Sequence, residues 1–187
     1  MPSWSSKQEC RSYYKSLCAQ EFAQGLVQNQ QQLNVHLRDY MSSQRGVWGA
    51  YRALAQEVSV DEVFQIEDVE WLFPRVKGTQ LEFCLASGFS QGAFGVLEPD
   101  PTSTPVNLHL IRGLLIPGLV FNKNGNRLGK GKGFYDKTLS NFQGTKVGVC
   151  FDFQVSERML PMEDHDIKMD YLITESGLIE CRQFEVH

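Results

Sequence analysis

The chain of 187 residues has no long apolar run: no stretch approaches the roughly 18 consecutive apolar residues that a membrane-spanning helix needs. Its first seven residues contain no apolar core, so we expect no secretory signal there. It also lacks a C-x-x-C pair, and its cysteines are odd in number and widely spaced: Cys10, Cys18, Cys84, Cys150 and Cys181. These absences argue against a disulfide framework and a structural zinc site, and they predict a reducing, cytoplasmic location.

A surplus of basic residues is missing as well. The net charge is −4, whereas nucleic-acid binders normally carry excess positive charge, so we expect neither a nucleic-acid partner nor a membrane partner. Positive charge is instead concentrated in residues 127–137, where Asp136 opposes four cations: Arg127, Lys130, Lys132 and Lys137. An acidic chain with one basic, glycine-rich segment is suited to holding a compact anion.

The composition is that of a globular protein, with 42% hydrophobic and 21% charged residues. We predict one domain over residues 1–187. Ser6 and Glu9 form the pattern of a capping box, which predicts a helix from there to about Ala23, with a break at Gly25. Apolar residues at four-residue steps predict a second helix that includes Leu33, Leu37, Tyr40 and Met41.

Short apolar or aromatic segments predict strands at Val47–Tyr51, Trp71–Val76, Leu81–Leu85, Gly113–Ile116, Val147–Phe151 and Tyr171–Thr174. A further helix is expected at Ser59–Gln65, and the proline-rich stretch Glu98–Pro105 is expected to be a loop. Helices that alternate with buried strands indicate an α/β fold: a single-domain mixed or mostly parallel sheet flanked by helices on both faces.

The basic segment follows the strand that ends near Pro117, and ligands in open α/β sheets bind beyond the carboxyl ends of strands. Glycines at 129, 131 and 133 have no Cβ, so the backbone can bring its N–H groups against a phosphate. Arg127 can hold phosphate oxygens with two hydrogen bonds, while the lysines supply charge. The segment matches neither G-x-x-x-x-G-K-[ST] nor G-x-G-x-x-G. A flexible, solvated loop of Gly and Lys is the alternative.

The order Arg-Leu-Gly-x-Gly-x-Gly-Phe-Tyr-Asp after a strand that ends in Pro-Gly resembles the ATP-binding loop of the 5-formyltetrahydrofolate cyclo-ligase family. The resemblance extends over nearly the whole chain, with landmarks at Pro74-Arg75, at Phe94-Gly95 followed by Glu98-Pro99, and at Asp164–Asp166. It implies that ATP contacts Lys7, Arg11, Arg127, Gly129, Lys130, Gly131, Lys132, Gly133, Phe134 and Tyr135.

The resemblance also implies a role for each remaining site residue. Arg127 and Lys132 would be catalytic, neutralising the phosphoryl group as it transfers. Asp136 and Asp166 would hold Mg²⁺, a cation that prefers carboxylate and phosphate oxygens. Glu57 would accept N–H bonds from the pterin ring, and Tyr51 or Trp48 would supply apolar walls. Taken alone, each of these residues could be an ordinary surface or core residue.

The chain departs from the family pattern at two positions: Asn122 stands where an aspartate is usual, and Phe134 where tyrosine is more frequent. The region 44–56 is loosely similar, which leaves the folate pocket less well supported than the ATP loop.

The resemblance implies an enzyme that converts 5-formyltetrahydrofolate and ATP to 5,10-methenyltetrahydrofolate, ADP and phosphate, as a monomer or weak homodimer. Two alternatives remain open. One is an enzyme of the same fold that acts on another N-formyl compound, because resemblance fixes the use of ATP better than it fixes the substrate. The other is a nucleotide-binding module without turnover.

Overall fold

The computed structural model describes residues 4–92 and 95–181. Three α-helices lie in this part of the chain: α1 (Lys7–Gln24), α2 (Val27–Ser42) and the short α3 (Phe134–Leu139). Three 3-10 helices accompany them: η1 (Asp61–Gln65), η3 (Leu108–Leu110) and η4 (Asp152–Gln154). Gly25 ends α1 with a φ of 83°, in the left-handed region that glycine tolerates, so the predicted break between the first two helices is confirmed.

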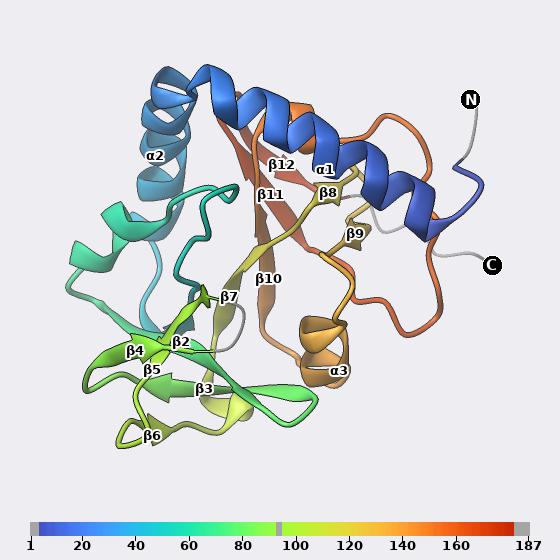
Figure 1. Ribbon diagram of the computed structural model, residues 1–187. Helices are drawn as coiled ribbons and strands as arrows, with labels where there is room; N and C mark the ends of the chain where they lie inside the picture. Colours follow the sequence, from blue (N-terminus) through green and yellow to red (C-terminus); the bar gives the residue numbers. More distant parts are fainter. Residues whose placement is uncertain (1–3, 93–94, 182–187) are drawn as a thin grey trace.

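An eight-stranded sheet forms the centre of the molecule (Figure 1). In spatial order its strands are β12 (Gly177–Glu180), β11 (Tyr171–Thr174), β10 (Thr145–Val149), β7 (Gly113–Pro117), β1 (Gly46–Gly49), β2 (Val69–Lys77), β3 (Gln80–Leu85) and β6 (Thr104–Pro105). The five strands from β11 to β2 run parallel, and the strands outside them pair antiparallel. Two small hairpins lie outside this sheet, β4 (Phe89–Gln91) with β5 (Leu97–Pro99), and β8 (Val120–Phe121) with β9 (Arg127–Leu128).

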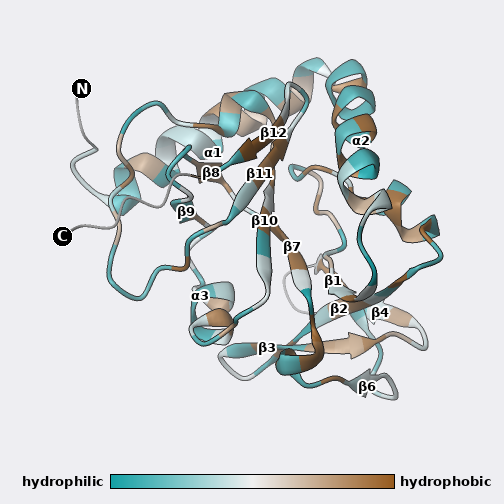
Figure 2. Cartoon of the chain, turned by 180° about the vertical axis from the view of Figure 1, so that it is seen from behind, coloured by the Kyte–Doolittle hydropathy of each residue, from teal (hydrophilic) through white to brown (hydrophobic). Residues whose placement is uncertain are grey.

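The sheet is buried on both faces, as the apolar runs in its central strands predict. Successive side chains of β7 point to opposite faces, so Leu115 joins one core and Leu114 and Ile116 the other. Helix α2 covers the first face with Leu33, Leu37 and Met41, whose side chains are fully buried. Leu139 of α3 and Phe121 of β8 pack on the second. Figure 2 shows the hydrophobic strands β7 and β11 between helices of mixed character.

Helix α1 packs through a separate apolar cluster. Its buried residues Cys10, Tyr14 and Cys18 contact Val120 and Leu128 of the β8–β9 hairpin. Figure 1 shows α1 lying across this hairpin, away from β2, β3 and β5. The helix therefore places its amino-terminal turn beside the segment that follows β9.

The predicted α/β fold, with a mostly parallel sheet and helices on both faces, is confirmed. Three local predictions held only in part: the helix at Ser59–Gln65, the loop at Glu98–Pro105 and the capping box. Residues 61–65 form a 3-10 helix, so Ser59 lies outside it. The stretch 98–105 is not all loop, because Pro99 ends β5 and Thr104-Pro105 pairs with β3 at the edge of the sheet, where proline is tolerated.

The capping box is half formed, because the Ser6 hydroxyl accepts the N–H of Glu9 at 3.1 Å, while the Glu9 carboxylate binds Ser5 instead. Within residues 4–92 and 95–181, no helix is long and apolar enough to span a membrane.

Candidate functional site

A cavity of about 940 Å³ opens at the carboxyl ends of β1, β2 and β7. Its basic side comes from α1, from β9 with the loop after it, and from the segment before β11. The basic side comprises Lys7, Arg11, Arg127, Gly129, Lys130, Gly131, Lys132, Gly133, Phe134, Tyr135, Asp136, Glu163, His165 and Asp166. Its apolar side comes from the loop after β1 and from β2, β3 and β5. The apolar side comprises Tyr51, Arg52, Leu54, Glu57, Pro74, Val76, Leu81, Val96 and Glu98. The structure thus brings the predicted site residues together, except Trp48.

Arg127 is fixed at the base of the basic side. Its side chain is 5% exposed, its Nε donates to the carbonyl of Pro117 at 2.9 Å, and its Nη1 lies 3.4 Å from Oδ1 of Asp136. The guanidinium also lies 5.1 Å from the centre of the Tyr135 ring. Burial lowers the pKa of Arg127, although the neighbouring Asp136 opposes that shift. An anion that enters here meets a guanidinium whose position is already set.

The glycines of the loop have the conformations and the space that a phosphate cradle requires. A Cβ on Gly129 would lie 2.8 Å from Nη2 of Arg127, so a side chain here would displace the guanidinium from its position. Gly131 has a φ of 105° and Gly133 a φ of 67°, both in the left-handed region. Arg11 holds the start of the loop by donating from Nε to the carbonyl of Gly129 at 3.1 Å. Helix α3 begins directly after Gly133.

Lys7 reaches across the site to the segment before β11. Its Nζ lies 2.6 Å from Asp166 and 2.8 Å from Glu163. Burial lowers the pKa of Lys7, but the two hydrogen-bonded carboxylates outweigh that effect and raise it above its usual value. Side-chain oxygens or nitrogens of Glu163, His165 and Asp166 lie within 4.8 Å of one another, a grouping that could hold a metal ion. The sequence prediction named Asp166 and missed Glu163, whose spacing carries no metal-binding pattern.

Glu57 is held in the loop after β1. Its Oε2 accepts the N–H of Leu54 at 3.0 Å, and its Oε1 lies 2.7 Å from Nζ of Lys130. Tyr51 lines the cavity and donates its hydroxyl to the carbonyl of Val58 at 2.8 Å, which closes the loop around Glu57. Tyr51 had been placed in the strand, but β1 ends at Gly49.

Of Tyr51 and Trp48, either of which was expected to wall the pocket, Tyr51 lines the cavity and Trp48 does not. Trp48 is 2% exposed and packs in the core beneath the sheet, because its position in β1 points its side chain to the α2 face. Lys137 lines the cavity although it is exposed. Arg52, Leu54 and Glu98 also line the cavity, although no pattern in the sequence assigns them a role there. Of the family landmarks, Phe94 lies outside the described residues.

Asn122, which departs from the family pattern, has a structural role in the β8–β9 hairpin. It is 4% exposed, and its Oδ1 accepts the N–H groups of Asn124 at 3.1 Å and Asn126 at 3.0 Å. A neutral amide oxygen accepts these bonds as a carboxylate oxygen does. Asn122 therefore stabilises the turn that precedes Arg127, and it does not line the cavity.

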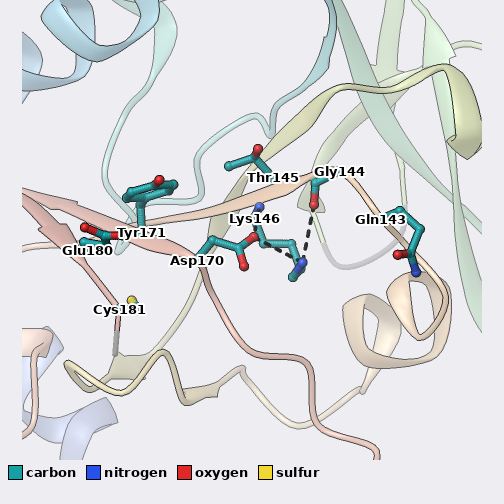
Figure 3. Close-up of a pocket in the computed structure, with 8 residues that line it drawn as sticks. All are labelled: Gln143, Gly144, Thr145, Lys146, Asp170, Tyr171, Glu180 and Cys181. Atoms are coloured by element: carbon teal, nitrogen blue, oxygen red, sulfur yellow. Dashed lines mark hydrogen bonds and ion pairs between the residues drawn. The ribbon is translucent and has the colours of Figure 1, made fainter. Parts of the chain in front are cut away.

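A second hollow of about 960 Å³ lies at the amino ends of β10 and β11. Figure 3 shows its lining, in which Lys146 extends toward Asp170 and the carbonyl of Gly144. Lys146 Nζ lies 3.1 Å from Oδ2 of Asp170. This hollow is at the opposite end of the strands from the glycine loop, and none of the predicted site residues line it.

The family assignment follows from a sequence comparison. Residues 6–175 match the 5-formyltetrahydrofolate cyclo-ligase family. The chain belongs to this family. It is 33% identical over 93 residues to the 5-formyltetrahydrofolate cyclo-ligase of Mycolicibacterium smegmatis, covering 48% of this chain and 47% of that protein. It is 43% identical over 70 residues to that of Escherichia coli K12, covering 36% and 38%. The chain thus spans about half the length, or less, of these curated relatives.

Solved structures agree with the family's fold. The NMR structure of Aquifex aeolicus 5,10-methenyltetrahydrofolate synthetase matches with a TM-score of 0.77 at 28% identity, covering 97% of this chain and 95% of that one. A 5,10-methenyltetrahydrofolate synthetase from Mycoplasma pneumoniae matches with a TM-score of 0.70 at 22% identity, covering 88% and 98%, and that likeness supports the fold. The overall fold is therefore that of the family.

Proposed function

We propose that this protein converts 5-formyltetrahydrofolate to 5,10-methenyltetrahydrofolate, with ATP cleaved to ADP and phosphate in the presence of Mg²⁺. The observation that supports this most is one cavity with two chemically different sides. The basic side offers five cations and a glycine loop to a polyphosphate, and the apolar side offers Leu54, Val76 and Val96 with the held carboxylate of Glu57 to a flat heterocycle. Family membership supplies the reaction that joins two such ligands.

The reaction needs ATP because the formyl oxygen is a poor leaving group. Transfer of the γ-phosphoryl group to that oxygen turns it into a phosphate ester, and the formyl carbon becomes an electrophile. N10 of the folate then attacks this carbon and loses its proton to solvent, the C–O bond breaks, phosphate leaves, and the methenyl bridge remains. Phosphoryl transfer of this kind depends on positioning and charge neutralisation more than on covalent help from the protein.

The residues of the basic side suit that task. Arg127, held by Pro117 and Asp136, would grip the transferring group from the base of the cavity. Lys132 projects from the loop between two glycines and would neutralise charge as it develops. Lys7 and Arg11 lie on one face of α1, four residues apart, and both line the cavity. We propose that they bind the rest of the triphosphate.

Carboxylates suited to Mg²⁺ lie beside this loop. Asp136 and Asp166 both line the cavity, and Glu163 lies next to Asp166. Their oxygens are hard donors, the kind that Mg²⁺ prefers, so the donor set fits the ion. When bound, the ion would neutralise phosphate charge. We propose that Lys7, which now pairs with Asp166, turns toward the phosphates when that carboxylate binds the metal, whereas the buried Arg127 is already in place.

On the apolar side we propose that Glu57 accepts the N–H groups of the pterin ring and that Tyr51 fixes the loop that carries it. The ring would lie against Leu54 and the neighbouring aliphatic side chains. All five thiols are free and buried, which suits a reducing compartment, and we place the enzyme in the cytoplasm.

The proposal can be tested with purified protein by following the absorbance of the methenyl product. With 5-formyltetrahydrofolate, ATP and Mg²⁺ we expect product and ADP to appear one for one. Omission of ATP, or addition of EDTA, should abolish turnover. Product formed without ATP, or turnover unchanged by EDTA, would contradict the mechanism.

A second candidate function is that of an enzyme of this family that acts on another N-formyl compound. The observation that favours it is that Arg52 and Glu98 add charges of both signs to the apolar side. Competition decides between the two. If another formamide supports faster ATP cleavage than 5-formyltetrahydrofolate does, the second candidate is correct.

A further inference from the structure

Lys130 and Glu57 form an ion pair across the cavity, with Nζ 2.7 Å from Oε1. Lys130 belongs to the glycine loop on the basic side, and Glu57 belongs to the loop after β1 on the apolar side. The pair thus joins the two regions to which the proposed function assigns the two substrates. Each charged group is occupied by the other before either substrate is present.

The two partners differ in how firmly they are held. Glu57 is 11% exposed, its second oxygen accepts the N–H of Leu54, and its loop is closed by the Tyr51 hydroxyl. Lys130 is 41% exposed and lies between two glycines, one of them at a φ of 105°. The carboxylate is therefore the fixed partner, and the lysine on its flexible stem is the partner that can move away.

Both substrates need the atoms that the pair occupies. A pterin ring that donates to the Glu57 carboxylate competes with Lys130 for Oε1. A phosphate group bound by Lys130 competes with Glu57 for Nζ. Whichever substrate binds first separates the pair and leaves the freed group available to the other substrate.

We propose that the Lys130–Glu57 pair makes the two substrates bind cooperatively, so that Lys130 competes with folate for Glu57 as well as binding phosphate. The inference rests on the proposed function and adds to it a positive coupling between ATP and 5-formyltetrahydrofolate. The first ligand breaks the pair, and the second ligand binds a protein in which it is already broken. Because linkage is reciprocal, each substrate must tighten the other by the same factor.

The exposure of Lys130 sets the size of the effect. Coupling between sites is typically 5- to 150-fold, and a pair with one exposed partner belongs near the lower end. We expect a factor of about 5. The same factor should appear in three measurements: the coupling in the wild type, the gain in folate affinity when the lysine is removed, and the gain in ATP affinity when the carboxylate is removed. The three should agree because each measures the free energy needed to separate Lys130 from Glu57.

The experiment measures dissociation constants by titration calorimetry with a non-hydrolysable ATP analogue plus Mg²⁺, and with 5-formyltetrahydrofolate, each alone and each with the other at saturation. The variants are Lys130→Met, Glu57→Gln and the matched control Lys132→Met, which removes the same charge from the same loop. Thermal unfolding of each variant verifies that it is folded.

In the wild type each ligand should tighten the other about 5-fold. Lys130→Met should bind 5-formyltetrahydrofolate about 5-fold tighter than the wild type, bind the ATP analogue more weakly, and show no coupling. Glu57→Gln should bind the ATP analogue tighter than the wild type. Lys132→Met should change the affinity for the analogue little and should retain the coupling, because Lys132 acts mainly as the phosphoryl group transfers.

Two results overturn the inference while leaving the proposed function intact. One is an active wild type whose ligands bind independently. The other is a Lys130→Met variant that binds folate no tighter than the wild type and retains the coupling. If the wild type binds no 5-formyltetrahydrofolate at all, the proposed function fails and the inference fails with it.

Discussion

The two sides of the cavity differ in the number and arrangement of their charged groups. On the basic side the cations are already paired with carboxylates, Lys7 with Asp166 and Arg127 with Asp136. On the apolar side, aliphatic residues from the loop after β1, from β2 and from β3 lie around the carboxylate of Glu57, and Glu98 of β5 lines the same side. The difference follows from the ligands that each side would take. A phosphate is recognised by charge and by backbone N–H groups, whereas a heterocycle is recognised by shape and by a few directed hydrogen bonds.

The largest effect is expected on the basic side. Lys132→Ala should lower kcat by about 10²–10³-fold and change the KM for ATP much less, because its charge acts mainly as the phosphoryl group transfers. Lys137 is unsuitable as a control, since it lines the cavity. Lys123 is the better control, because it is exposed and pairs with Glu157 at 3.0 Å.

Steady-state kinetics of Lys132→Ala and Lys123→Ala provide the measurement. Equal activity in the two variants would show that this loop is not where phosphoryl transfer takes place. A large rise in KM with kcat intact would show instead that Lys132 binds the ground state.

On the apolar side, Glu57→Gln should weaken binding of 5-formyltetrahydrofolate by about 1.5–3 kcal/mol, the range for hydrogen bonds to charged groups. That loss corresponds to roughly a 10- to 150-fold rise in Kd. ATP binding should not weaken. Calorimetry with each ligand checks this, and Glu67→Gln, a change at an exposed carboxylate before β2, is the control. Equal losses of affinity for both ligands would show that Glu57 does not contact the pterin ring.

Variants at Asn122 test how much the β8–β9 hairpin, which carries Arg127 of the basic side, depends on the Asn122 side chain for its stability. Asn122→Ala leaves the N–H groups of Asn124 and Asn126 without their acceptor and should lower the free energy of unfolding by about 1–3 kcal/mol. Asn122→Asp retains an acceptor oxygen and should lose less. Urea unfolding of both variants checks the order. If the aspartate variant is as unstable as the alanine variant, the acceptor is not what matters.

The smallest effect concerns pH. A hydrogen bond from Lys7 lowers the pKa of Glu163 below its ordinary value of 4.5. A lowered pKa in the folded state stabilises the protein above pH 4.5, and the contribution is lost as the pH falls through the folded value. Glu163→Gln should therefore have a slightly lower Tm than the wild type at pH 7, and the difference should shrink below pH 4.5. A difference that stays constant down to pH 3 would rule out this pairing.

The sequence predicted the central elements of the fold because their signals are local. The buried runs at β7, β10 and β11 and the four-residue spacing in α2 each depend on neighbours along the chain. Predictions failed where distant partners decide the structure. Thr104-Pro105 becomes a strand because β3 offers it a sheet edge, and residues 61–65 tighten into a 3-10 helix beneath α2.

The candidate site shows the same difference between residues recognisable from a local pattern and residues brought together by the fold. Glycines 129, 131 and 133, with Arg127 and the lysines among them, could be recognised from the sequence alone, because a phosphate cradle is made from one continuous segment. Tertiary structure decided which distant residues meet that segment. Lys7 reaches Asp166 across 159 positions of sequence, and Lys130 reaches Glu57 from a different loop. Such pairings depend on how α1 and the loop after β1 pack against the sheet, and no spacing within one segment encodes them.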